Sequence, residues 1–143
     1  MNWKKIFLGG IVAGLIINVL DFIVAFLLTN KIYKNFETKG LLASEPRLPF
    51  IPLWILGMFV MGCLLAWFYA VARPRLGAGP RTALLVSFIL ALMVHCPYNF
   101  AEACWAPTGR LLPLIHMVAG IIEYVIAGFF AAWIYQEKEE KAN

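Results

Sequence analysis

IFLGGIVAGLIINVLDFIVAFLLT, residues 6–29, decides the fold class of this 143-residue chain. At a rise of about 1.5 Å per residue, a helix of this length exceeds the roughly 20 residues needed to cross a hydrocarbon core of about 30 Å. Three further apolar segments of comparable length follow at residues 50–72, 82–101 and 111–135. The sequence therefore predicts an all-α polytopic membrane protein whose four transmembrane helices form an up-down bundle.

The composition places the whole chain in the membrane-protein class. It is 62% hydrophobic and only 14% charged, with a mean hydropathy of +0.80, which excludes an ordinary soluble domain. Four spans leave no room for a folded domain outside the bilayer, so we expect a single membrane domain over residues 1–143. Cys63, Cys96 and Cys104 form no CxxC pair, and no disulfide framework is expected.

The positive charges indicate how the chain is oriented in the membrane. If the N-terminus is cytoplasmic, seven of the twelve Lys and Arg residues fall on the cytoplasmic side. The connection between the second and third segments holds Arg73, Arg75 and Arg81 and no acidic residue. The positive-inside rule therefore favours cytoplasmic N- and C-termini. We expect these arginines to contact lipid phosphates, and the net charge of +4 to be matched by the lipid bilayer rather than by nucleic acid.

The connections between the segments differ in length. The turn over residues 73–81 is short, Pro74 is expected to end the second helix, and the connection over about residues 102–110 is also short. Short connections predict that the second and third helices, and the third and fourth, are antiparallel neighbours. The longest polar segment, about residues 30–49, is expected to be a loop and leaves open a short interfacial helix around residues 32–38.

Small residues on regular helical faces indicate where the helices approach one another. Gly10, Gly14 and Asn18 share one face of the first segment, and Gly120 and Ala127 share one face of the fourth. Glycine and alanine allow close approach of two backbones in a membrane, and asparagine can hydrogen-bond across the interface. We expect these five residues to lie at helix–helix contacts.

Ionisable and polar residues inside the predicted spans form the candidate site: Asp21, His95, Asn99, His116 and Glu123. By helical rise, Asp21 lies roughly 12 Å below the outer surface, and His95 and His116 lie about 9 and 8 Å below it. Glu123 falls near the midplane. Charged groups are costly at such depths and normally face the interior of a bundle. We therefore expect these residues to converge in the outer half of the membrane.

Three interpretations of this cluster compete. Chained Asp, Glu and His residues are typical of proton or ion relays and of solute transporters. His95 and His116, at matching depth on adjacent helices, could instead ligate haem or the magnesium of a chlorin. A hydrolytic metal site lacks any HExxH-like spacing, so we predict no metal site and no catalytic residue.

The stretch WFYAVARPRLGAGPRTA, residues 67–83, resembles a signature of small bacterial four-helix integral membrane proteins of uncharacterised function. The resemblance extends to the charged start with its glycine-rich first helix and to Trp-Ile-Tyr at residues 133–135. It implies a bacterial inner membrane and four spans. It implies no activity, because none is known for the family.

The sequence favours a structural or accessory subunit of a larger, energy-transducing membrane complex, packed against other membrane subunits or further copies of itself. Small residues on several helix faces and the absence of a catalytic motif support this expectation. The alternative is a small transporter of protons, ions or a solute that uses the intramembrane polar residues. The haem- or chlorin-binding four-helix subunit is a second alternative.

Overall fold

Six helical elements make up the computed structural model, which describes residues 1–43, 45, 46 and 48–135. They are α1 (Trp3–Val24), η1 (Ala25–Thr29), α2 (Asn30–Thr38), α3 (Phe50–Leu76), α4 (Pro80–Trp105) and α5 (Leu111–Ile134). No strand occurs among these residues. Four helices, with α1, η1 and α2 counted as one, are long and apolar enough to cross a membrane. The prediction of an all-α, four-span bundle is confirmed.

The first helix is longer than the sequence suggested, because it does not end at Thr29. It passes through η1, a single stretch of π-helix, and continues as α2 to Thr38. Neither Gly nor Pro interrupts residues 25–39, and the Thr29 hydroxyl donates to the Ala25 carbonyl at 3.3 Å. The helix ends only where Gly40 adopts a φ of +69°. The loop that we expected over about residues 30–49 therefore begins about ten residues further along the chain, after Thr38.

The second span also runs further than predicted, to Leu76 rather than residue 72. Pro74 does not end it, since a proline in the last turn removes only one backbone hydrogen bond. The end comes at Gly77, whose φ of +86° leaves the helix and whose N–H donates to the Arg73 carbonyl at 2.9 Å. After a short turn, Pro80 occupies the first turn of α4.

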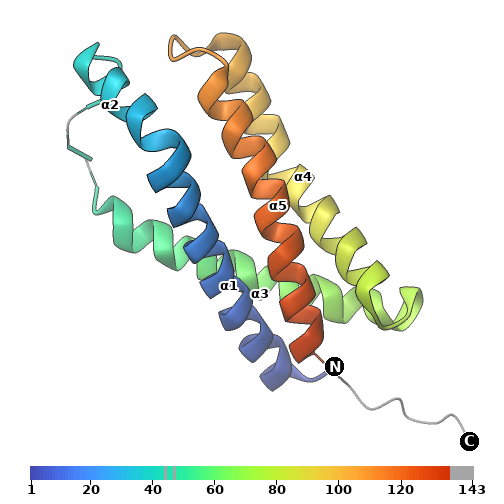
Figure 1. Ribbon diagram of the computed structural model, residues 1–143. Helices are drawn as coiled ribbons and strands as arrows, with labels where there is room; N and C mark the ends of the chain where they lie inside the picture. Colours follow the sequence, from blue (N-terminus) through green and yellow to red (C-terminus); the bar gives the residue numbers. More distant parts are fainter. Residues whose placement is uncertain (44, 47, 136–143) are drawn as a thin grey trace, which may run out of the picture.

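The helices pack in an order that the connections did not predict. The most extensive contacts join α1 to α3, α4 to α5 and α1 to α5. In Figure 1, α1, α4 and α5 run side by side, while α3 passes behind them. Thus α4 and α5 are close neighbours as expected, but α3 contacts α4 much less than it contacts α1. A short turn joins two helix ends without aligning the rest of their lengths.

Glycines on both helices let α1 and α3 pack closely. A Cβ atom added to Gly14 would lie 2.7 Å from the Phe59 Cα atom, and one added to Gly62 would lie 2.5 Å from the Gly10 carbonyl oxygen. Asn18 stays beside this seam, where its side-chain amide donates to the Gly14 carbonyl at 2.8 Å. The backbones of the two helices are therefore in direct contact.

The two ends of the bundle differ in chemistry. At one end the Asn2 N–H donates to the Tyr135 hydroxyl at 3.3 Å, and the Arg73 guanidinium lies 5.8 Å from the centre of the Tyr135 ring. We call this the arginine end. The opposite end, which we call the α2 end, holds α2 and the connection from α4 to α5. The candidate site lies between the middle of the bundle and the α2 end.

Candidate functional site: a polar cluster inside the bundle

Asp21 links α1 to α3 through a hydrogen bond, in addition to lying near other ionisable groups. Its carboxylate accepts a hydrogen bond of 2.8 Å from the indole N–H of Trp54. This pairing could not be predicted from the sequence, because Trp54 has the position of an ordinary interfacial aromatic residue. The Asp21 carboxylate, far from the start of α1, thus accepts a hydrogen bond from the neighbouring helix.

His116 joins α5 to α2. Its Nε2 atom lies 3.3 Å from the Tyr33 hydroxyl, and the two rings meet edge to face at 6.3 Å between centroids. This contact exists because the first helix continues past Thr29 and carries Tyr33 over the start of α5. Tyr33 could have been predicted as part of the site only if the continuation of the first helix past Thr29 had been recognised.

His95 lies against the backbone of α5. A Cβ atom added to Gly120 would be 2.5 Å from the His95 Nδ1 atom, so the imidazole occupies the space that this glycine leaves. The ring also meets Tyr124 edge to face at 5.0 Å between centroids. Its Nε2 atom is buried and has no hydrogen-bond partner within the described part of the chain. Asn99, one turn further along α4, donates to the His95 carbonyl at 2.8 Å.

Glu123 is the deepest ionisable residue of the site. It lies on α5 with only 5% of its surface exposed, next to the fully enclosed Tyr124. The Asp21 carboxylate is close enough for its charge to act on Glu123, His95 and His116. The structure thus brings residues of α1, α4 and α5 into one electrostatic cluster.

The cluster extends towards the α2 end through Glu102. This half-buried residue lies near the end of α4, and its charge acts on both Tyr33 and His116. With Tyr33 and Trp54, Glu102 completes the set of functional groups that the predicted site lacked. We call the following residues the polar cluster: Asp21, Tyr33, Trp54, His95, Asn99, Glu102, His116 and Glu123.

The geometry of the histidines bears on haem or chlorin binding. The His95 ring packs on Gly120, whereas His116 contacts Tyr33. The His116 Nε2 atom is thus already engaged by the Tyr33 hydroxyl, whereas the His95 Nε2 atom has no partner among the described residues. Cofactor binding stays a prediction. Among residues 1–43, 45, 46 and 48–135, no group of three or more His, Cys, Asp and Glu side chains is arranged to hold a metal ion.

The remaining predicted residues lie where they can pack helices or contact lipid. Gly120 and Ala127 are buried on α5, and Ala127 has no exposed surface. Arg75 and Arg81 are exposed at the arginine end, whereas Arg73 is half-buried. The three arginines therefore differ in their surroundings, although we made the same prediction for all three from the sequence.

Comparison with protein-family models, with curated proteins and with solved structures finds no match. The resemblance of residues 67–83 to small bacterial membrane proteins stays a prediction. Function is therefore inferred from the residues of this chain and their geometry.

The contact between Gly120 and His95 leads to a first prediction. Gly120→Ala should lower the stability of the protein by about 1–3 kcal/mol, because the new methyl group collides with the imidazole. In a His95→Ala background the same substitution should cost much less, and the two effects should be strongly non-additive. Thermal unfolding of the four proteins in detergent measures both differences. Equal costs in the two backgrounds would show that the ring does not occupy this space.

Proposed function

We propose that the polar cluster transfers protons through the bundle, with Glu123 as the central carrier. The observation that carries this proposal is the burial of a carboxyl group in the apolar interior, within electrostatic range of Asp21. A charge at such a depth costs at least 2–3 kcal/mol, so intramembrane carboxyl groups are typical of proton and ion pathways. Imidazole, phenol and carboxyl groups can each exchange a proton with a neighbour.

The proposed route begins at the α2 end. Glu102, Tyr33 and His116 would receive a proton there, since the phenol and imidazole lie 3.3 Å apart. From this group the proton would pass to the level of Asp21 and then to Glu123. Every member of this half of the route acts electrostatically on at least one other.

The second half of the route, from Glu123 to the arginine end, has fewer polar groups. Ser87 packs against Gly128, and Tyr69 and Tyr135 are buried near the end of α5. Along α5, about 8 Å separates the level of Glu123 from that of Gly128, and about 10 Å separates Gly128 from Tyr135. Both distances are longer than a hydrogen bond. The proposal therefore requires bridging water to enter between the levels of Glu123 and Tyr135.

Reconstitution of the purified protein into liposomes tests whether protons move. With a potassium gradient and valinomycin setting the membrane potential, a pH-sensitive dye should report a flux that depends on the protein. Asp21→Asn should slow this flux, because it removes the charge that acts on the other members of the cluster. A correctly folded wild-type protein that adds no flux to that of empty liposomes would contradict the proposal.

A second candidate function is that of an accessory subunit in a larger membrane complex. Gly57 supports it, since a Cβ atom at this position of α3 would meet nothing within 4 Å. The surrounding first half of α3 is exposed and apolar, so a helix of another protein could approach Gly57 closely. Gly57→Leu should then remove a partner on a native gel of mild-detergent extracts, with the stability of the isolated chain unchanged. An unaltered migration would leave the accessory role without support.

We also propose that the protein resides in the bacterial inner membrane with both termini in the cytoplasm. The arginines of residues 73–81 support this orientation, and the exposed Cys104 lies at the other end of the bundle. In intact cells, an impermeant thiol reagent should label Cys104. It should reach a cysteine placed at Gly77, in a Cys104→Ser background, only after the cells are broken. Labelling of the Gly77→Cys protein in intact cells would show the opposite topology.

A further inference from the structure

The first helix changes its winding between two members of the polar cluster. The π-helical turn η1 lies between Asp21 on α1 and Tyr33 on α2. Successive residues of an α-helix lie about 100° apart around its axis, so twelve residues of unbroken α-helix would place Tyr33 about 120° from Asp21. A π turn bonds residue i to i+5 and holds about one residue more than an α turn. It therefore turns α2 back by about 100°, and Tyr33 comes to nearly the same face as Asp21.

Burial along the first helix shows the same change of face. Ile17 on α1 and Thr29 at the end of η1 both have no exposed surface, although an unbroken α-helix would place them about 120° apart. In such a helix Leu28 would lie within about 20° of Ile17, yet its side chain is 55% exposed. The π turn thus changes which residues of the first helix face the bundle.

Thr29 stabilises this turn from inside the bundle. Its buried hydroxyl donates to the Ala25 carbonyl, so a side chain satisfies a backbone acceptor at the start of η1. Hydrogen bonds from threonine to the carbonyl four residues earlier disturb a regular α-helix. Neither Gly nor Pro occurs in η1. The change of winding is therefore supported by a buried side chain and is not a break in the helix.

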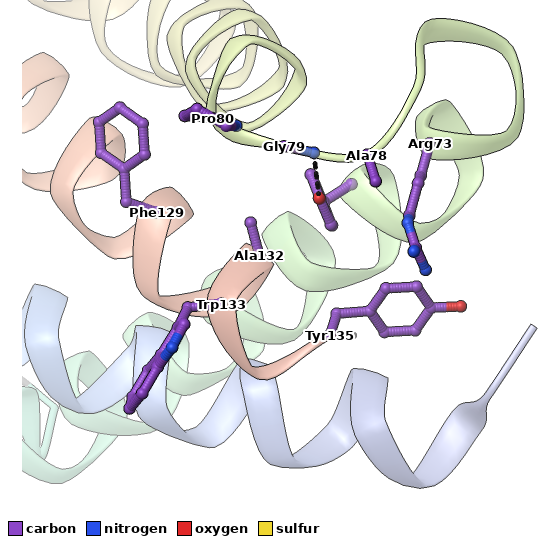
Figure 2. Close-up of a pocket in the computed structure, with 9 residues that line it drawn as sticks. Arg73, Ala78, Gly79, Pro80, Phe129, Ala132, Trp133 and Tyr135 are labelled. Atoms are coloured by element: carbon purple, nitrogen blue, oxygen red, sulfur yellow. Dashed lines mark hydrogen bonds between the residues drawn. The ribbon is translucent and has the colours of Figure 1, made fainter. Parts of the chain in front are cut away.

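Little else fixes the rotation of α2. At the arginine end, the turn between α3 and α4 is held by a tertiary hydrogen bond, in which the Gly79 N–H donates to the buried Tyr69 hydroxyl at 3.2 Å (dashed line in Figure 2). Within the described part of the chain, α2 has extensive contacts only with η1. Tyr33 and the buried Phe36 share one face of α2, so the rotation that η1 sets decides what both side chains meet.

We propose that η1 is a positioning segment that rotates α2 so that the Tyr33 hydroxyl meets the His116 Nε2 atom. The inference rests on the proposed proton route, in which these two groups receive the proton. The 3.3 Å separation of the two atoms and the edge-to-face rings are the alignment that the π turn produces. The Asp21 charge acts on both residues, as expected if Tyr33 and Asp21 share a face.

Changes in the length of η1 have opposite effects under this proposal. A π turn corresponds to an α turn with one residue inserted. Deletion of Leu28 should convert η1 into a regular α turn and leave Tyr33 within about 20° of the Asp21 face. Insertion of one alanine between Leu27 and Leu28 should instead rotate α2 by about 100° and remove Tyr33 from His116. Leu28 faces outwards, so its deletion removes no buried contact.

Nuclear magnetic resonance of the full-length protein in detergent, with protonated Tyr and His in a deuterated background, measures the contact directly. The wild type and the Leu28 deletion should both show a nuclear Overhauser effect between the Tyr33 and His116 rings, and the alanine insertion should lose it. Loss of this signal in a folded Leu28 deletion would overturn the proposal, and so would its retention in the insertion. The deletion decides the question even if the insertion does not fold.

Deletion of Leu64 is the matched control, because this exposed leucine lies in the uninterrupted α-helix α3. It should prevent recovery of a monodisperse protein, whereas the Leu28 deletion should not; equal losses would contradict the role of η1. In liposomes the Leu28 deletion should keep the proton flux within about twofold of wild type, and the insertion should lower it by about tenfold or more. A wild type without flux would disprove the proton route, and the ring contact would still decide whether η1 positions Tyr33.

Discussion

Gly62→Leu is expected to separate α1 from α3 and to prevent recovery of a monodisperse protein. A Cβ atom at this position would lie 2.5 Å from the Gly10 carbonyl oxygen and 2.7 Å from the Gly14 Cα atom. Overpacking usually costs about 1–3 kcal/mol when side chains can move aside. Here the colliding atoms belong to a helix backbone, so the whole helix must shift and the Asp21–Trp54 hydrogen bond is lost with it.

Gly57 offers a matched control for this substitution. It lies five residues earlier in α3, and a Cβ atom there meets nothing within 4 Å. Gly57→Leu should therefore leave the unfolding temperature of the isolated chain within a few degrees of wild type. Fluorescence-detected gel filtration and thermal unfolding in detergent measure both variants. Similar behaviour of Gly62→Leu and Gly57→Leu would mean that α1 and α3 do not meet through their glycines.

The spans could be predicted from the sequence because a bilayer imposes one simple requirement on every helix. Each apolar segment had to reach about 20 residues, and all four did. The ends were harder to predict. Polar residues after Thr29 suggested a loop, but neither Gly nor Pro stands between Ala25 and Lys39 to stop the helix. Polarity shows where a chain leaves the hydrocarbon, not where its helix ends.

The rotation and neighbours of the helices could not be predicted from the sequence. Gly10 and Gly14 share a helix face, yet nothing in the chain says that Gly62 and Phe59 complete the contact. Asp21 was recognisable as an ionisable residue within a span, but its hydrogen-bond donor is 33 residues away on α3. Helical periodicity defines the faces of one helix, whereas the choice between faces depends on the packing of all four.

Glu123→Gln is expected to abolish proton flux while leaving the bundle folded. Glutamine has nearly the same size and can keep hydrogen bonds, but it cannot release a proton at any accessible pH. Removal of a positioned proton-transfer group typically costs about 100-fold or more in rate. Burying a neutral amide does not carry the desolvation penalty of burying a charged carboxylate. The unfolding temperature of Glu123→Gln should therefore be unchanged or higher.

Glu37→Gln is the matched control for that loss. Glu37 is an exposed carboxyl group on α2, outside the polar cluster, and the same chemical change there should leave the flux at the wild-type rate. Reconstitution at equal protein density, confirmed by gel filtration before and after, keeps the comparison free of differences in insertion.

Proton flux into liposomes that contain wild-type, Glu123→Gln or Glu37→Gln protein, at a fixed membrane potential, tests the central claim most directly. We predict a flux for the wild type and for Glu37→Gln, and a flux at the level of empty liposomes for Glu123→Gln. A Glu123→Gln protein that is folded and conducts protons as fast as the wild type would contradict the assignment of this buried carboxyl group as the carrier.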